Sequence, residues 1–382
     1  MPVQKLKYIT IEIYKPKCYN CCMLINCTKK LQDELMIKPE KAEVFDSLYS
    51  WHANIIKINR RKTIVLVNDA SGYVVILRYL KAKDFKSINI LITESIKEIL
   101  IADCIKPEIV DKYLADGGKI AFSKTQNRSL IAKMNKGCEA ADVFDEEYNL
   151  DTIPQDYVTR KANHWIFTHI DNETYHPNEL FYNYLVERFS QPIFSTKALV
   201  LNIRLDLKNH DIWRRVIVPL NIHFYELHRV IRAAFDWGYY HLHDFVIYEN
   251  AEPFLRVLCN EDDLETYQDD EMICLERETK ISEYLPKYKS INYTYDFGDN
   301  WVHNIEIENV LFDYENNYAV CLEGKANRPP EDVGGEGGYE EFMEIMDDPN
   351  HEEYESAKGF YENQHYKGFD IDLVNRQLKH LY

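Results

Sequence analysis

Several features that would place this chain in a familiar class are missing from its sequence. No apolar run approaches the roughly 18 residues of a membrane-spanning helix, and the N-terminus lacks the apolar core and cleavage site of a signal peptide. The nine cysteines are scattered and odd in number, so they predict no disulfide framework. These absences argue against membrane-spanning and disulfide-rich secreted proteins, and we expect a location in the reducing cytoplasm.

The sequence also lacks the ligands that a structural zinc site needs. Residues 18–22 read Cys-x-x-Cys-Cys, but four zinc ligands usually come from two separate pairs, and no second Cys-x-x-Cys exists. We expect residues 1–22 to be a non-native or disordered extension, with Met23 rather than Met1 as the natural start. The residues from Met23 read as the opening of a domain, because a short apolar strand leads to Thr28, which is suited to cap a helix.

Charge is distributed unevenly along the chain. Of the net −18, residues 1–160 contribute +4, from 25 basic and 21 acidic side chains, and residues 161–382 contribute −22, from 20 and 42. Because so acidic a half repels phosphate backbones, we do not expect it to bind nucleic acid. Only the first half could do so, through a basic patch that is more simply a solvated face. The patch would consist of His52, Arg60, Arg61, Lys62, Lys124, Asn127 and Arg128.

The length of the chain and its many aromatic residues allow more than one domain. With 382 residues, 28 Tyr, 17 Phe and 5 Trp, two or three domains with large cores are possible. We predict an N-terminal domain over 23–190, a linker over 191–197 and a C-terminal domain over 198–382. Both are predicted to be α+β, the second with a mixed or antiparallel sheet and helices packed on one side.

Hydrophobic periodicity locates the elements of both domains. In the first domain, β-branched runs at 63–68 and 73–78 flank an Asp-Ala-Ser-Gly turn, which predicts a hairpin. Helices are predicted at 90–101, 108–115 and 178–189. In the second domain, strands are predicted at 198–207, 212–219, 241–248, 291–296, 301–310 and 318–322, and helices at 224–235, 339–346, 352–361 and 370–381.

The densest polar motif is the hairpin sequence Tyr-Thr-Tyr-Asp-Phe-Gly-Asp-Asn-Trp-Val-His of residues 293–303. A two-residue turn at 298–299 would place Asp296 opposite Trp301 and on the same face as His303. Asp296 and His303 would then be diagonal neighbours, roughly 7–8 Å apart at the backbone.

Two further histidines, His241 and His243, are spaced to share one face of a strand. With His303 and Asp296 they could bind a divalent metal ion, or Asp296 could orient His303 in an acid–base pair. The same residues could instead form a buried polar network that ties the hairpin to its neighbours, or bind a ligand without chemistry. The sequence leaves these alternatives open.

A second dense motif, Pro-Pro-Glu-Asp-Val-Gly-Gly-Glu-Gly-Gly, covers residues 329–338. Its prolines and glycines hold Glu331 and Asp332 on a fixed turn that suits a metal ion or an arginine side chain. Phosphate binding is not expected, because acidic rather than basic residues follow the glycines. The catalytic candidates are His303 and Asp296. The candidates for binding or metal ligation are His241, His243, Asp296, Asp299, Trp301, His303, Glu331 and Asp332.

These motifs carry a family resemblance. The chain from about Leu199 to Leu381 resembles the plasmid pRiA ORF-three-like family, on ordered matches at 212–219, 226–228, 241–245, 295–303, 329–339 and 369–375. Arg328 departs from the pattern, because the family usually has cysteine before the Pro-Pro pair, and this puts a thiol role in doubt. Residues 23 to about 190 resemble an uncharacterised bacterial domain of unknown function.

The resemblance implies an α+β fold and a cytoplasmic bacterial protein, but no established activity. Some relatives are labelled resolvase, yet the acidic domain offers neither the arginine cluster nor the helix-turn-helix of a serine recombinase. Our leading hypothesis is a binding or accessory module associated with mobile elements or host defence. One alternative is a metal-dependent hydrolase-like enzyme that uses the His/Asp cluster. The other is a nucleic-acid-linked regulator that acts through the N-terminal domain.

Overall fold

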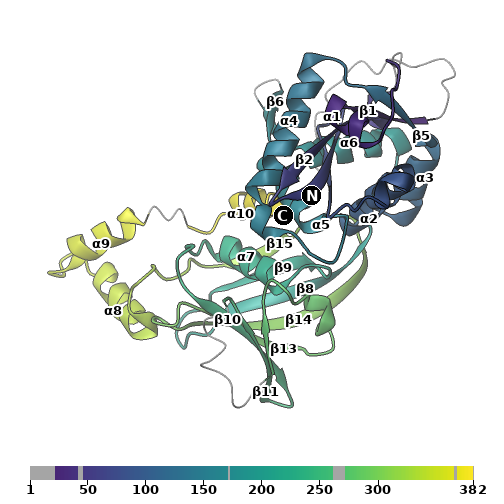
Figure 1. Cartoon of the computed structure of the whole chain (residues 1–382). Coiled ribbons are helices and arrows are strands. Elements are labelled where there is room, and N and C mark those ends of the chain that lie inside the picture. Colours follow the sequence, from purple (N-terminus) through teal and green to yellow (C-terminus); the bar gives the residue numbers. More distant parts are fainter. Residues whose placement is uncertain (1–21, 42–45, 171–172, 261–271, 365–367, 382) are drawn as a thin grey trace. The chain divides into compact units, whose positions relative to one another are not determined.

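The chain forms two compact units, Met1–Gln191 and Pro192–Tyr382, each with its own sheet and helices (Figure 1). This confirms the predicted α+β class. The computed structural model describes residues 22–41, 46–170, 173–260, 272–364 and 368–381. The expected extension over residues 1–22 therefore lies outside the described residues, apart from Cys22. No helix in these ranges has both the length and the apolar character needed to cross a bilayer.

The N-terminal unit is built on a mixed sheet in the strand order β4-β3-β2-β1-β5. β1 is parallel to β2 and β5, whereas β3 is antiparallel to β2 and β4. The strands are β1 (Cys22–Cys27), β2 (Ser50–Ile58), β3 (Arg61–Asn68), β4 (Val74–Arg78) and β5 (Lys119–Lys124). The helices are α1 (Lys29–Glu34), α2 (Ile88–Ala102), α3 (Pro107–Gly117), α4 (Arg128–Val143), α5 (Asp156–Trp165) and α6 (Pro177–Phe189), and β6 (Thr168–Ile170) pairs with β7 (Glu173–Tyr175).

Local sequence signals account for much of this unit. The predicted hairpin is β3 and β4, and the three predicted helices are α2, α3 and α6, each within a few residues of its expected ends. The Thr28 side chain caps α1 by accepting from the Leu31 amide, as predicted. Helix α4 packs very closely on the sheet, because a Cβ added to Gly137 would lie 2.6 Å from Cγ2 of Val67.

The C-terminal unit contains a larger sheet in the order β12-β11-β10-β13-β14-β8-β9-β15. All neighbouring strands are antiparallel except β11 and β12, so the sheet is mixed, as predicted. Its strands are β8 (Thr196–Leu205), β9 (Trp213–Pro219), β10 (His243–Glu249), β11 (Glu252–Leu258), β12 (Met272–Leu275), β13 (Ser290–Tyr295), β14 (Trp301–Tyr314) and β15 (Val320–Lys325).

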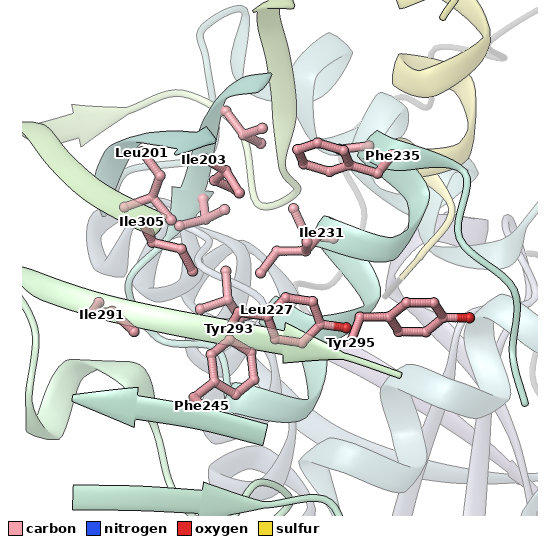
Figure 2. Close-up of a cluster of buried hydrophobic side chains, with 14 of the residues drawn as sticks. Leu201, Ile203, Leu227, Ile231, Phe235, Phe245, Ile291, Tyr293, Tyr295 and Ile305 are labelled. Atoms are coloured by element: carbon pink, nitrogen blue, oxygen red, sulfur yellow. The ribbon is translucent and has the colours of Figure 1, made fainter. Parts of the chain in front are cut away.

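Helix α7 (Phe224–Phe235) buries its apolar stripe against this sheet, and this contact forms the core. Figure 2 shows Leu227, Ile231 and Phe235 of the helix directed at Ile203 and Tyr293 of the strands. The helix begins after His223, whose backbone amide donates to the Glu226 carboxylate at 2.6 Å and so satisfies a free amide of the first turn. The described residues of this unit also form the α-helices α8 (Gly335–Asp347), α9 (Tyr354–Asn363) and α10 (Ile371–Lys379).

Candidate functional site

The central hairpin differs in register from the prediction. In the ladder between β13 and β14, Tyr295 is opposite Trp301 and Tyr293 is opposite His303. The turn therefore covers residues 296–300 and is not a two-residue turn at 298–299. The left-handed backbone falls on Asp296 (φ 57°) and Asn300 (φ 56°), and the Asn300 amide donates to the Asp296 carbonyl at 2.6 Å. Aspartate and asparagine tolerate this conformation, and this allows the longer turn.

The predicted pairing of His303 with Asp296 is wrong as a result. His303 is fully buried, and its Nε2 accepts from the Trp237 indole at 3.0 Å. Its Nδ1 donates to two backbone carbonyls, that of Trp301 at 3.0 Å and that of Tyr293 at 3.3 Å. Burial lowers the pKa of His303 to about 3, and the two backbone hydrogen bonds only partly oppose this. His303 is thus a neutral core residue with both nitrogens occupied, and Trp301 is likewise buried beside it.

His243 is also separated from the candidate cluster. Strand β10 begins at His243, so His241 lies in the preceding loop. The prediction that the two histidines share one face of a strand is therefore wrong. The His243 ring stacks on His228 with centroids 3.5 Å apart, and its Nε2 lies 2.9 Å from Oε2 of Glu276. Burial lowers the pKa of His228 well below its usual value. His243 therefore belongs to a buried polar group beneath α7.

Three of the predicted residues do converge. His241, Asp296 and Asp332 each offer one ligand atom within 4.8 Å of the others. His241 Nδ1 lies 3.4 Å from Oδ2 of Asp296, and its Nε2 lies 3.4 Å from Oδ1 of Asp332. Within the described part of the chain, His241 Nε2 is buried and has no hydrogen-bond partner. We call these three residues the His241 cluster.

Glu331 lies at the buried side of the His241 cluster, with its Oε2 3.7 Å from His241 Nε2. The Gly238 amide donates to its Oε1 at 2.6 Å, and the Tyr295 hydroxyl is 3.3 Å from its Oε2. Burial raises the pKa of Glu331, although the Gly238 amide and the nearby Arg328 oppose the shift. These contacts hold the Glu331 carboxylate in one place.

Asp299 has a positioning role. Its Oδ2 accepts from the Gly334 amide at 3.2 Å, which joins the hairpin turn to the glycine-rich loop. Gly335 (φ 69°) lies so close that an added Cβ would be 2.8 Å from the Asp299 carbonyl oxygen. Only glycine permits both this approach and this backbone conformation, and the contact brings Asp332 next to Asp296.

Arg328, the residue that departs from the family pattern, is buried behind this loop. Its Nε donates to the Asp236 carbonyl at 2.9 Å, its Nη1 donates to the Pro329 carbonyl at 2.6 Å, and its guanidinium lies over the Trp237 ring. Arg328 therefore anchors the Pro-Pro turn through hydrogen bonds, which a cysteine could not do at this reach.

Sequence reasoning missed a rim of exposed, mostly aromatic side chains around the His241 cluster. Tyr239, Tyr240 and Leu242 flank His241 in the chain, Phe297 follows Asp296, and all four side chains are exposed. The Tyr240 ring lies 4.5 Å from the His241 ring. The consecutive tyrosines before His241 were the available signal, since exposed apolar side chains next to polar ligands are typical of binding sites.

In the N-terminal unit, His52 does not contribute to a basic surface. Its ring is buried, with Nδ1 2.6 Å from Oδ1 of Asp69 and Nε2 3.2 Å from the Gln126 amide that donates to it. Ser50 also donates to Asp69, at 2.6 Å. His52 therefore belongs to an internal network.

Each of the two units matches a known family model. Residues 197–378 match the family model of the plasmid pRiA4b ORF-3-like protein, and residues 24–180 match a domain of unknown function (DUF6933). The uncharacterized protein y4hQ of Sinorhizobium fredii is 36% identical over 155 residues, which cover 40% of this chain and 75% of that protein.

A solved structure is also similar. The protein of unknown function MM3350 from Methanosarcina mazei Go1 shares 33% sequence identity, with a TM-score of 0.40, and the match covers 46% of this chain and 96% of that chain. Through its C-terminal unit, the chain belongs to the plasmid pRiA4b ORF-3-like family, joined to an N-terminal domain of unknown function.

Proposed function

We propose that the C-terminal unit is a binding module whose His241 cluster holds a divalent metal ion. The observation that carries this proposal is the convergence of one imidazole and two carboxylates, with a buried imidazole nitrogen that has no hydrogen-bond partner among the described residues. Metal–ligand bonds of about 2.1 Å separate tetrahedral ligand atoms by about 3.4 Å. The cluster is somewhat wider than this, and Asp332, whose side chain is 63% exposed, has room to rotate inwards.

The charge of the site favours a cation. Three carboxylates, those of Asp296, Glu331 and Asp332, surround one imidazole, and the guanidinium of Arg328 lies 3.8 Å from the Glu331 carboxylate. A divalent ion would offset this negative charge. Imidazole with carboxylate oxygens suits zinc, manganese or iron better than calcium or magnesium, which prefer oxygen ligands alone.

The ligand that this module recognises would complete the coordination of the metal ion. Three protein ligands leave positions open, and the exposed Tyr240 and Phe297 border them. A partner that carries an oxygen donor next to an apolar group would use both features.

A hydrolase-like enzyme is the second candidate for the same site. Three protein ligands with an open position are also the arrangement of hydrolytic metal centres, in which the ion lowers the pKa of a bound water. Metal-dependent turnover of ester or phosphodiester substrates, lost in Asp296→Asn, would favour this enzyme. Binding without turnover would favour the module.

The wider role that we propose is that of an accessory protein of mobile elements or host defence in the reducing cytoplasm. The plasmid origin in the family description supports the first part. The nine cysteines are scattered along the sequence and odd in number, which supports the second. A third candidate is a regulator that contacts nucleic acid through the N-terminal unit. If this is correct, the full chain should bind DNA or RNA, and the binding should weaken as salt is added. Titration of DNA and RNA at low salt that shows no binding would reject this candidate.

Metal analysis of the purified full chain tests the proposal directly. After removal of metals with a chelator, calorimetric titration with Zn²⁺ or Mn²⁺ should show one bound ion per chain. His241→Ala and Asp296→Asn should lose this binding; asparagine keeps the left-handed backbone at position 296. His351→Ala is the matched control, because His351 is exposed and lies outside the cluster. Absence of binding in the wild type, or equal binding in His241→Ala, would reject the metal site.

A further inference from the structure

A second hollow of the C-terminal unit contains none of the three proposed metal ligands. It is a groove of about 720 Å³, within the size range of ligand-binding pockets. One wall is formed by α8 and the end of α9, and the other by the turn at 209–212 and the loop at 325–330. Both helices lie near the C-terminal end of the chain (Figure 1). We call it the α8–α9 groove.

The lining of this groove on the helix side is apolar and adaptable. Phe342, Met343 and Met346 come from α8 and Tyr361 comes from α9, and the rings of Phe342 and Tyr361 are 6.0 Å apart. Methionine side chains are flexible and polarisable, and they are common on surfaces that accept a helix. None of the residues of α9 is buried, so this helix keeps apolar surface available.

Hydrogen bonds hold the two walls in place. The Lys208 amide donates to Glu336 at 2.8 Å and the Asn209 side chain donates to Glu340 at 3.1 Å, which ties the turn to α8. Beyond α9, Gln364 accepts from the Glu331 amide at 2.8 Å and donates to its carbonyl at 2.9 Å. The groove is therefore formed before any partner arrives, which lowers the ordering cost of binding.

The helices that border the groove carry strong negative charge. Residues 335–363 contain ten acidic side chains and a single basic one, Lys358, so their net charge is −9. The basic residues of the opposite wall are already engaged: Lys325 pairs with Asp211 at 2.9 Å, and Arg328 donates to backbone carbonyls. Two of these acidic side chains, Glu336 and Glu340, contact the turn of the opposite wall, so acidic groups stand at the rim of the apolar groove.

We propose that the α8–α9 groove binds an amphipathic helix of a partner protein, with its apolar face in the groove and basic side chains along the rim. Charge complementarity selects this occupant. Nucleic acid and anionic membranes would be repelled by the acidic rim. Pairing of this groove with the C-terminal unit of a second copy is disfavoured for the same reason, because residues 161–382 carry −22.

The test uses the full chain and a fluorescein-labelled peptide with leucine on one face and lysine on the other. The anisotropy of the peptide should rise with wild-type protein, and added salt should weaken the binding. Met346→Asp should weaken it at least about tenfold, since it puts a charge among apolar contacts. Phe312→Asp is the matched control, because Phe312 is an exposed apolar residue of β14 outside the groove, and it should bind as the wild type does.

Hydrogen exchange on the unmodified chain provides a readout that does not depend on a variant folding. The peptide should protect amides within residues 335–363 and leave β14 unchanged. Equal binding of a leucine–glutamate peptide, full binding by Met346→Asp, or protection confined to other elements would overturn the proposal. So would a wild-type dimer that Met346→Asp dissociates, because the occupant would then be a second copy.

Discussion

Replacing His303 with asparagine should make the free energy of unfolding of the C-terminal unit depend less on acid pH. His303 is fully buried and neutral, and its pKa falls from 6.5 to about 3. Because the folded-state pKa lies below the unfolded one, the unfolded chain takes up the proton first as the pH falls. This contribution to stability is therefore complete above pH 6.5 and is lost progressively between pH 6.5 and 3.

The size of the effect follows from the same two pKa values. Each unit of pH below the unfolded pKa costs about 1.4 kcal/mol, so the loss from His303 reaches about 2.7 kcal/mol at pH 4.5. This is a large part of the 5–15 kcal/mol or so that usually stabilises a domain. His303→Asn should be less stable at neutral pH, by about 1–3 kcal/mol, because it shortens a fully packed side chain. Its free energy of unfolding should then decline less steeply with acid than that of the wild type.

This difference can be measured at several pH values by urea unfolding of the full chain, with hydrogen exchange of peptides from β13 and β14 as the monitor of unfolding. The free energy of unfolding of His303→Asn, taken relative to the wild type, should rise by roughly 2–3 kcal/mol between pH 7 and 4.5, so the initial deficit shrinks and can change sign. Parallel pH profiles for the two proteins would refute the assignment of His303 as a buried neutral group. The pKa of His228 is also lowered by burial, but His228 is present in both proteins, so its contribution cancels when the two free energies of unfolding are compared.

Three further substitutions test the packing. Gly137→Ala should lower the melting temperature of the N-terminal unit, because the new Cβ would meet Val67 at 2.6 Å; an unchanged value would contradict this close approach. Gly335→Ala should destabilise the C-terminal unit by about 1–3 kcal/mol in urea titrations and weaken metal binding in calorimetry, since it displaces the loop from Asp299. Arg328→Met should cost about 2–4 kcal/mol in the same titrations, because two backbone carbonyls lose their donors; a loss below 1 kcal/mol or so would count against the anchoring role.

The strongly periodic segments were predictable, and the reason is local. Helix α7 occupies the residues predicted for it, because its apolar residues recur on one face and a glutamate caps its first turn. The hairpin of β3 and β4 was equally clear from its β-branched runs and its turn with a terminal glycine. Such signals lie within a few residues of one another, so the sequence displays them directly.

The site was only partly predictable, because its geometry depends on one turn. Placing the turn at 298–299 shifted the ladder by one residue, and a one-residue shift exchanges the two faces of a strand. His303 was thereby assigned to the cluster, and it lies instead in the core beside Trp237. The left-handed backbone at Asp296 and the contact of Asp299 with Gly335 are tertiary features that no spacing rule reveals.

The His241 cluster is assembled from three segments that are far apart in the sequence: the loop before β10, the hairpin turn and the glycine-rich loop. In the unfolded chain the three ligand atoms are not held close together. Any ligand that engages all three therefore adds its binding free energy to the folding free energy, and at a hundred times its Kd this amounts to about 2.7 kcal/mol. The fraction of C-terminal unit that survives heat or proteolysis would then report the concentration of that ligand around the protein.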